Sequence, residues 1–252
     1  MTHISKTDPS LVTARADVPA RWEERSTNRV LESRRDQILE RSRQIVEAAY
    51  ELLEEEGLQG LTIRAVLEKT GLSRRAFYER FADKDELVLA VFEHTIRLAT
   101  DRYSELVGAC PDPLERLRLI VTCLALGRSS LEAAASEQNG RRGAAMSREH
   151  LRLAESRPDD LQAALSPLLA LIAQQLSDGM QAGLVRQSDP KRLASLVYNL
   201  VSTTVHTELL AQETTRADEA HRVQLAADTW EFCRRGITAT GESPIEIDPL
   251  LR

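Results

Sequence analysis

The sequence predicts an all-helical protein, and three observations carry that prediction. Residues that break helices are sparse, with 11 glycines and 9 prolines among 252 residues, whereas Ala, Leu, Glu and Arg are abundant. Apolar residues recur at spacings of three and four through most of the chain. Capping signals, such as Asp followed by Pro, stand between these periodic segments. We therefore expect helices joined by turns.

The first 35 residues are expected to form a disordered or helical N-terminal arm. Residues 1–20 contain two prolines and few apolar residues, which is typical of disorder. Residues 21–35 interleave arginines with Trp22, Val30 and Leu31, and glutamates stand among them. Two interpretations stay open for this segment. It is either a solvated tail, or an arm that inserts arginine into a DNA minor groove.

A helix is predicted for residues 36–56, where Ile38, Ile45, Ala49 and Leu52 share helical spacing. Gly57 is expected to end this helix, because glycine adopts positive φ without strain.

The stretch after it predicts a helix-turn-helix. Thr62 can cap a first helix, Gly71 can end it, and Ser73 can cap a second helix from about Arg74 to Phe81. Phe77 and Phe81 stand four residues apart, so both are expected to face the core. This layout places the second helix in the DNA major groove in proteins that have it.

The basic residues of this second helix are the predicted DNA contacts. Arg74, Arg75, Tyr78 and Arg80 occupy the faces that the phenylalanines leave, and Lys84 lies at the start of the next helix. The net charge is −6, so affinity for DNA needs a local basic surface, which these residues and Lys69 supply. The alternative is a solvated helix face, with Tyr78 as a core residue that keeps its hydroxyl in water.

Further helices are expected downstream, with a loop over 135–145, a kink or an interruption at Ser166-Pro167 and an irregular tail. The predicted helices span residues 83–107, 113–134, 146–156, 159–182, 190–212 and 217–236. The expected organisation is an arm at 1–35, a DNA-binding domain at 36–84, an all-α ligand-binding and dimerisation domain at 85–240, and a tail at 241–252.

Residues 38–87 resemble the TetR family of bacterial transcription regulators. The resemblance lies in the glycine that ends the preceding helix, in Thr62-Ile63 and Gly71-Leu72-Ser73, and in the ungapped run from Phe77 to Leu87. Ala76 and Leu67 depart from the family pattern, which often has Thr and Ala there. The resemblance implies that Tyr78 and Lys84 hold phosphates and that Arg64 reaches DNA from the first helix. The candidate DNA-binding residues are thus Arg64, Ser73, Arg74, Arg75, Tyr78, Glu79, Arg80 and Lys84.

The resemblance also implies a homodimer that pairs helices 190–212 and 217–236 and reads a palindromic operator, with an ordinary monomer core as the alternative. The function expected is a repressor released by a small-molecule effector, and the apolar helices favour a lipophilic one. Candidate pocket residues, chosen only by their helix, are Phe92, Tyr103, Cys123, Met146 and Gln175.

Other functional classes find little support in the sequence. No phosphate-binding, zinc-protease or nucleophile motif occurs, so no catalytic residue, metal or cofactor is expected. Three widely spaced cysteines and the lack of an apolar run of about 20 residues predict a cytoplasmic protein without a membrane span. The alternative function is a helical enzyme or protein-interaction module that carries a helix-turn-helix head. Steep salt dependence of DNA binding with sequence preference would distinguish the regulator from both.

Overall fold

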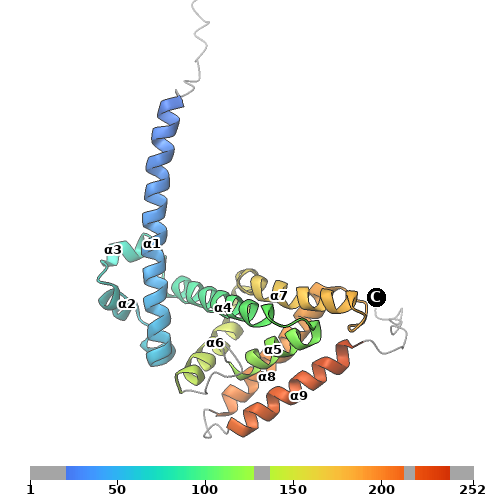
Figure 1. The fold of residues 1–252 in the computed structure, drawn as a ribbon. Helices are drawn as coiled ribbons and strands as arrows, with labels where there is room; N and C mark the ends of the chain where they lie inside the picture. The colour runs from blue at the N-terminus through green and yellow to red at the C-terminus, as the bar shows by residue number, and fades with distance from the viewer. Residues whose placement is uncertain (1–20, 128–136, 213–218, 239–252) are drawn as a thin grey trace, which may run out of the picture. The chain divides into compact units, whose positions relative to one another are not determined.

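The computed structural model describes residues 21–127, 137–212 and 219–238, and those residues are helical apart from turns and one isolated bridge between Val185 and Thr238. The all-α prediction is therefore confirmed (Figure 1). The helices are α1 (Arg21–Gly60), α2 (Ile63–Thr70), α3 (Arg74–Tyr78), α4 (Lys84–Gly108), α5 (Pro113–Leu126), α6 (Glu137–Ser156), α7 (Pro158–Gln181), α8 (Pro190–Gln212) and α9 (Glu219–Ile237). Predictions for residues 1–20 and 241–252 lie outside the described residues.

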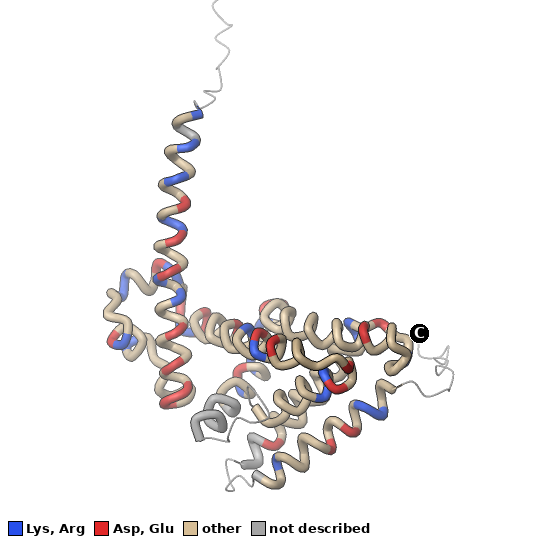
Figure 2. Tube along the Cα trace, viewed as in Figure 1, with Lys and Arg blue, Asp and Glu red and all other residues tan. Residues whose placement is uncertain are grey.

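The segment Arg21–Arg43 belongs to one compact unit of the chain, and Gln44–Arg252 form the other. Arg21–Arg43 is helical, so of the two forms expected for residues 21–35 the structure has the helical one. Arginines recur along this helix in Figure 2, and Trp22, Val30 and Leu31 are exposed between them.

Local capping builds the first helices of the second unit as the sequence predicts. Thr62 Oγ1 accepts a hydrogen bond from the Ala65 N–H at 3.1 Å, and Gly71 ends α2 with φ 67°. Ser73 Oγ accepts from the Ala76 N–H at 3.2 Å and so starts α3. Gly57, with φ 70° and ψ −166°, breaks the regular geometry of α1, although a helical turn resumes as far as Gly60.

The helix-turn-helix has its own core, and its second helix is shorter than predicted. Val66, Phe77 and Phe81 are buried there together with residues of α1 and α4. The predicted helix to Phe81 is wrong at its end, because α3 stops at Tyr78. The N–H groups of Arg80 and Phe81 both donate to the Phe77 carbonyl, so the chain turns there before Asp83 caps α4.

Three predictions for the C-terminal helices are corrected. Helix α5 ends at Leu126 rather than at Ala134, because Gly127 adopts φ 63°. The loop predicted over 135–145 is helical from Glu137, and Ala145 of α6 is buried in the helix-turn-helix core. Helix α7 continues through Pro167, which lies on the exposed face of the helix, so the chain is not interrupted there.

Helix α7 is the centre of the larger core, since it packs against α4, α5, α6 and α8, while α9 covers α5 and α8. Gly179 lets α7 approach the chain that follows it, because a Cβ there would lie 2.6 Å from Val185 Cγ2. Among the helices that the structure describes, none has the length and apolar character needed to cross a bilayer.

Candidate nucleic-acid interface and effector cavity

Helices α2 and α3 turn a set of cationic and aromatic side chains outward. The side chains of Arg64 and Arg75 are 88% and 89% exposed. Tyr78 is half exposed, and its ring packs edge-on against the buried Phe77 ring. Arg74 is exposed as well. The buried Phe77 thus fixes the helix, while its neighbours in sequence remain free for a partner.

The exposed arginines are held in place by carboxylates on their own helices. Arg64 Nε lies 2.8 Å from Glu68 Oε1, and this hydrogen bond raises the pKa of Arg64. Arg75 Nε lies 2.9 Å from Glu79 Oε1. A partner with phosphates can compete for these guanidinium groups, because exposed ion pairs contribute little to stability.

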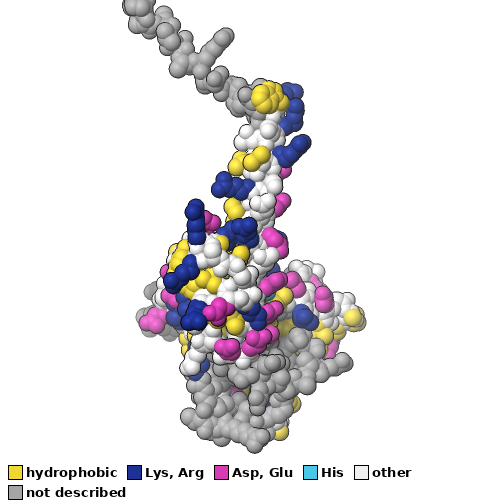
Figure 3. Space-filling view, turned by 90° about the vertical axis from the view of Figure 1, so that its left-hand side faces the viewer, with side chains coloured by type: hydrophobic (Ala, Val, Ile, Leu, Met, Phe, Trp, Pro, Cys, Tyr) yellow, Lys and Arg dark blue, Asp and Glu magenta, His cyan; other side chains and the backbone are white. Residues whose placement is uncertain are grey.

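A hollow of about 440 Å³ lies between α2 and α3 and is lined by Arg64, Leu67, Glu68 and Arg74. The space-filling view in Figure 3 shows Lys and Arg side chains beside hydrophobic ones on the face that it draws. The hollow brings together two predicted contact residues, Arg64 and Arg74, that come from different helices.

Two basic residues of the predicted DNA-binding surface instead make contacts within the protein. The Arg80 side chain is only 6% exposed, and one of its terminal nitrogens donates to the Ala76 carbonyl. Lys69 Nζ lies 3.1 Å from Glu51 and 3.2 Å from Glu55 of α1. The Arg80 side chain therefore folds back onto α3, and Lys69 joins α2 to α1.

The remaining candidates lie at helix starts. The Ser73 hydroxyl is exposed and caps α3, and Lys84 is the first residue of α4, half-buried beside its cap Asp83. Free backbone N–H groups at such a start favour an anion.

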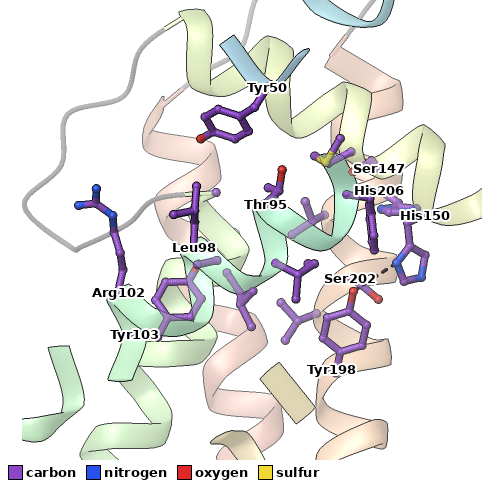
Figure 4. Close-up of a pocket in the computed structure, with 18 of the residues that line it drawn as sticks. Tyr50, Thr95, Leu98, Arg102, Tyr103, Ser147, His150, Tyr198, Ser202 and His206 are labelled. Atoms are coloured by element: carbon purple, nitrogen blue, oxygen red, sulfur yellow. Dashed lines mark hydrogen bonds between the residues drawn. The ribbon is translucent and has the colours of Figure 1, made fainter. Parts of the chain in front are cut away.

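A second cavity, of about 530 Å³, lies among α1, α4, α5, α6 and α8 (Figure 4). Of the predicted pocket residues, Phe92, Tyr103 and Met146 line it. Cys123 and Gln175 do not. Cys123 is buried in the larger core, and the side-chain amide of Gln175 donates to the Leu171 carbonyl within α7.

Sequence reasoning missed the contribution of α8 to this cavity. The prediction assigned α8 to the dimer interface, yet Tyr198, Val201 and His206 line the cavity. Polar residues at buried positions of an otherwise apolar helix were the available signal. His206 is 8% exposed and Tyr198 is 6% exposed.

Polar groups gather on the α6–α8 side of the cavity. Tyr198 Oη lies 3.2 Å from His150 Nδ1, and the rings of His150 and His206 are 5.1 Å apart and nearly perpendicular. Burial, with a smaller effect from His206, lowers the pKa of His150 to about 4. Burial also lowers the pKa of His206 and raises that of Tyr198.

The cavity shares helices with the helix-turn-helix. Tyr50 and Glu54 of α1 line it, and the Tyr50 hydroxyl donates to Glu54 at 2.9 Å. Met146 of α6 packs against the helix-turn-helix core as well. Arg152 of α6 lies 3.2 Å from Asp85 at the start of α4. A shift of the side chains that line the cavity can therefore be transmitted to the helices against which α2 and α3 pack.

Comparison with known proteins identifies the N-terminal part of the chain. Residues 45–91 match the family described as bacterial regulatory proteins, tetR family. The transcriptional repressor KstR2 of Mycobacterium tuberculosis is 29% identical over 82 residues, which are 32% of this chain and 41% of KstR2. The chain thus matches less than half the length of that relative. Its name is that of a transcriptional repressor, in agreement with the prediction that the chain is not an enzyme.

Solved structures extend the likeness in fold to the C-terminal helices. A TetR-family regulator from Pectobacterium atrosepticum has a TM-score of 0.63 at 20% identity, covering 82% of this chain and 98% of that one. FadR from Bacillus subtilis, solved in complex with stearoyl-CoA, has a TM-score of 0.57 at 19% identity, covering 77% and 98%. By sequence, residues 45–91 thus match the TetR family of bacterial regulatory proteins, and the described helices share the fold of solved TetR-family structures.

Proposed function

We propose that this protein is a sequence-specific DNA-binding repressor that a small lipophilic effector releases from a palindromic operator. The observation that carries the proposal is the outward set Arg64, Arg74, Arg75 and Tyr78 on two capped helices above a buried core. We retain the predicted division into a DNA-binding part at 36–84 and an effector-binding and dimerisation part at 85–240.

The contact residues divide by the chemistry that each offers. Tyr78 and Lys84 hold phosphates, since a hydroxyl and an ammonium at a helix start suit an oxyanion. Arg74 and Arg75 read base edges, because a guanidinium can bond guanine through two donors. Glu79 orients Arg75, and Arg80 is left out of the interface because its side chain is buried.

A homodimer through α8 and α9 is part of the proposal. Leu196 of α8 and Val223 and Phe232 of α9 are exposed by 58%, 47% and 69%. Large apolar side chains in such numbers on adjacent helices favour burial against a second copy. A two-fold dimer reads half-sites about 34–36 Å apart, or a multiple of that distance, and so a palindrome.

Release by an effector is supported by the position of the cavity. Its volume of about 530 Å³ suits a small molecule, and Phe92, Ile96 and Val205 give it apolar walls. Because α1 and α4 belong both to these walls and to the helix-turn-helix core, an effector can favour a dimer whose α3 helices no longer match successive grooves. The names of KstR2, a repressor, and of FadR with stearoyl-CoA agree with repression and with a lipophilic effector.

Selection of the purified protein against a random-sequence DNA library tests the proposal. We expect an enriched palindrome, and binding to it that falls steeply with salt. Tyr78→Phe and Lys84→Ala should weaken binding to all sequences, with the salt slope of Lys84→Ala reduced by about 1. Arg75→Ala should cost about 1–3 kcal/mol and relax preference at one base pair.

Arg118→Ala is the control, because Arg118 is likewise paired with a glutamate on its own helix but lies on α5, outside the proposed DNA and dimer surfaces. It should leave sequence preference unchanged. No enriched palindrome, or unchanged affinity in all three interface variants, would contradict the proposal.

A further inference from the structure

Three hydrogen-bonding side chains form a polar subsite at one side of the cavity. His150 comes from α6, and Tyr198 and His206 come from α8. Figure 4 draws them together, with Arg102 and Tyr103 on the opposite side. The cavity lining also includes apolar side chains, Ile96 and Ala99 among them.

His206 is the unusual member of this subsite. It is 8% exposed, and neither of its ring nitrogens has a hydrogen-bond partner among the described residues. The nearby Ser202 hydroxyl donates to the Asn199 carbonyl instead. A buried polar group without a partner destabilises a fold, so an orphaned imidazole in a cavity wall indicates a group that a ligand satisfies.

We propose that His206, together with the His150–Tyr198 pair, binds the hydroxyl group of an alcohol or phenol whose apolar body lies along α4 and α8. This inference rests on the proposed function, since it takes the cavity as the effector site. A neutral imidazole offers one N–H donor and one acceptor nitrogen, and a hydroxyl group can complement either of them. Tyr198, already bonded to His150, can complete the set by turning its own hydroxyl.

A carboxylate fits the same place poorly. Arg102 is the one cationic side chain among the described residues that line the cavity, and it lies on the far side. Glu54 of α1 adds a negative charge to the wall. Burial keeps both histidines neutral at pH 7, since it lowers the pKa of His150 to about 4 and lowers that of His206 as well. An anion would therefore lose its hydration without gaining a cation.

The test uses the full chain without DNA and a panel of bicyclic and branched apolar scaffolds, each in a methyl, a hydroxyl and a carboxylate form. Binding is measured by saturation-transfer NMR and calorimetry. We expect the hydroxyl forms to bind about tenfold tighter than the methyl forms, as for one or two net hydrogen bonds. His206→Phe keeps a ring of similar shape and should abolish this preference. Tyr103→Phe removes a hydroxyl from the opposite wall and should keep it.

Preference for the methyl or carboxylate forms, an unchanged preference in His206→Phe, or no binding of any form would overturn the inference. If His206→Phe fails to fold, nitrogen NMR of the histidine-labelled wild-type chain replaces it. The hydroxyl forms, and not the methyl forms, should then shift the His206 ring nitrogens, and equal shifts would overturn the inference. If no expected preference is found in this panel but the DNA selection enriches a palindrome, the proposal of a DNA-binding regulator stands. If the DNA selection enriches no palindrome, the proposed function itself is refuted.

Discussion

Replacing Gly71 by alanine tests the argument that a left-handed turn sets the angle between α2 and α3. Gly71 has φ 67° and ψ 12°, and its N–H donates to the Leu67 carbonyl. A Cβ built at this position meets no atom within 4 Å, so the substitution adds strain but no collision. The left-handed conformation costs an alanine about 1–2 kcal/mol.

The lower entropy of the unfolded alanine chain offsets part of this cost, by about 0.4–1 kcal/mol. The net loss of stability for Gly71→Ala should therefore be about 1 kcal/mol, or about 2–4 °C in melting temperature for a chain of this size. Gly71→Asn should lose less than half as much, since asparagine adopts the left-handed region more readily.

Thermal unfolding followed by circular dichroism, at one fixed protein concentration, measures these differences. Gly108→Ala is the matched control, because Gly108 ends α4 with open space around its Cβ and without positive φ. It should be neutral or stabilise the protein by up to about 1 kcal/mol. Equal effects at the two positions would refute the role of φ, and a loss above about 3 kcal/mol at Gly71 would refute the absence of a collision.

Three further predictions concern a cap, the histidines and a buried amide. Ser73→Ala should cost about 1 kcal/mol in chemical unfolding, because the Ala76 N–H loses its acceptor, whereas Ser73→Asp should restore the cap. Folding lowers the pKa of His150 to about 4 and that of His206 below its usual value, so the unfolded chain binds more protons below pH 6.5. The free energy of unfolding should therefore be highest above about pH 6.5 and decrease as the pH drops toward 4. The decrease should be smaller in His150→Phe. An equal decrease in that variant would contradict the assignment of this pH dependence to His150. Gln175→Met should leave the melting temperature unchanged or raise it, because the buried Gln175 Oε1 has no hydrogen-bond partner, and a clear decrease would show that this amide stabilises the core.

Helix starts were predictable where a local interaction decides them. The caps at Thr62, Ser73 and Asp83 join a side-chain oxygen to a backbone N–H three residues later, so the sequence alone contains both partners. Composition gave a wrong prediction where tertiary packing determines the secondary structure. The Ser, Asn and Gly content before Ala145 indicated a loop, yet the segment from Glu137 is helical, and Ala145 is buried in a core that includes α1 and α4.

The sequence by itself determined the all-helical class, the TetR-family match of residues 45–91 and the capped turn between α2 and α3, because each depends on residues close together in the chain. Only the tertiary structure decided which side chains a partner can reach and which line the cavity. Arg80 stood on an outward face of a regular helix, but α3 ends at Tyr78 and the side chain folds back. His150 and His206 stand 56 positions apart in the sequence, and only the packing of α6 against α8 brings their rings to 5.1 Å. Caps are local interactions, whereas burial and cavity walls come from helices far apart in the chain, which no local pattern specifies.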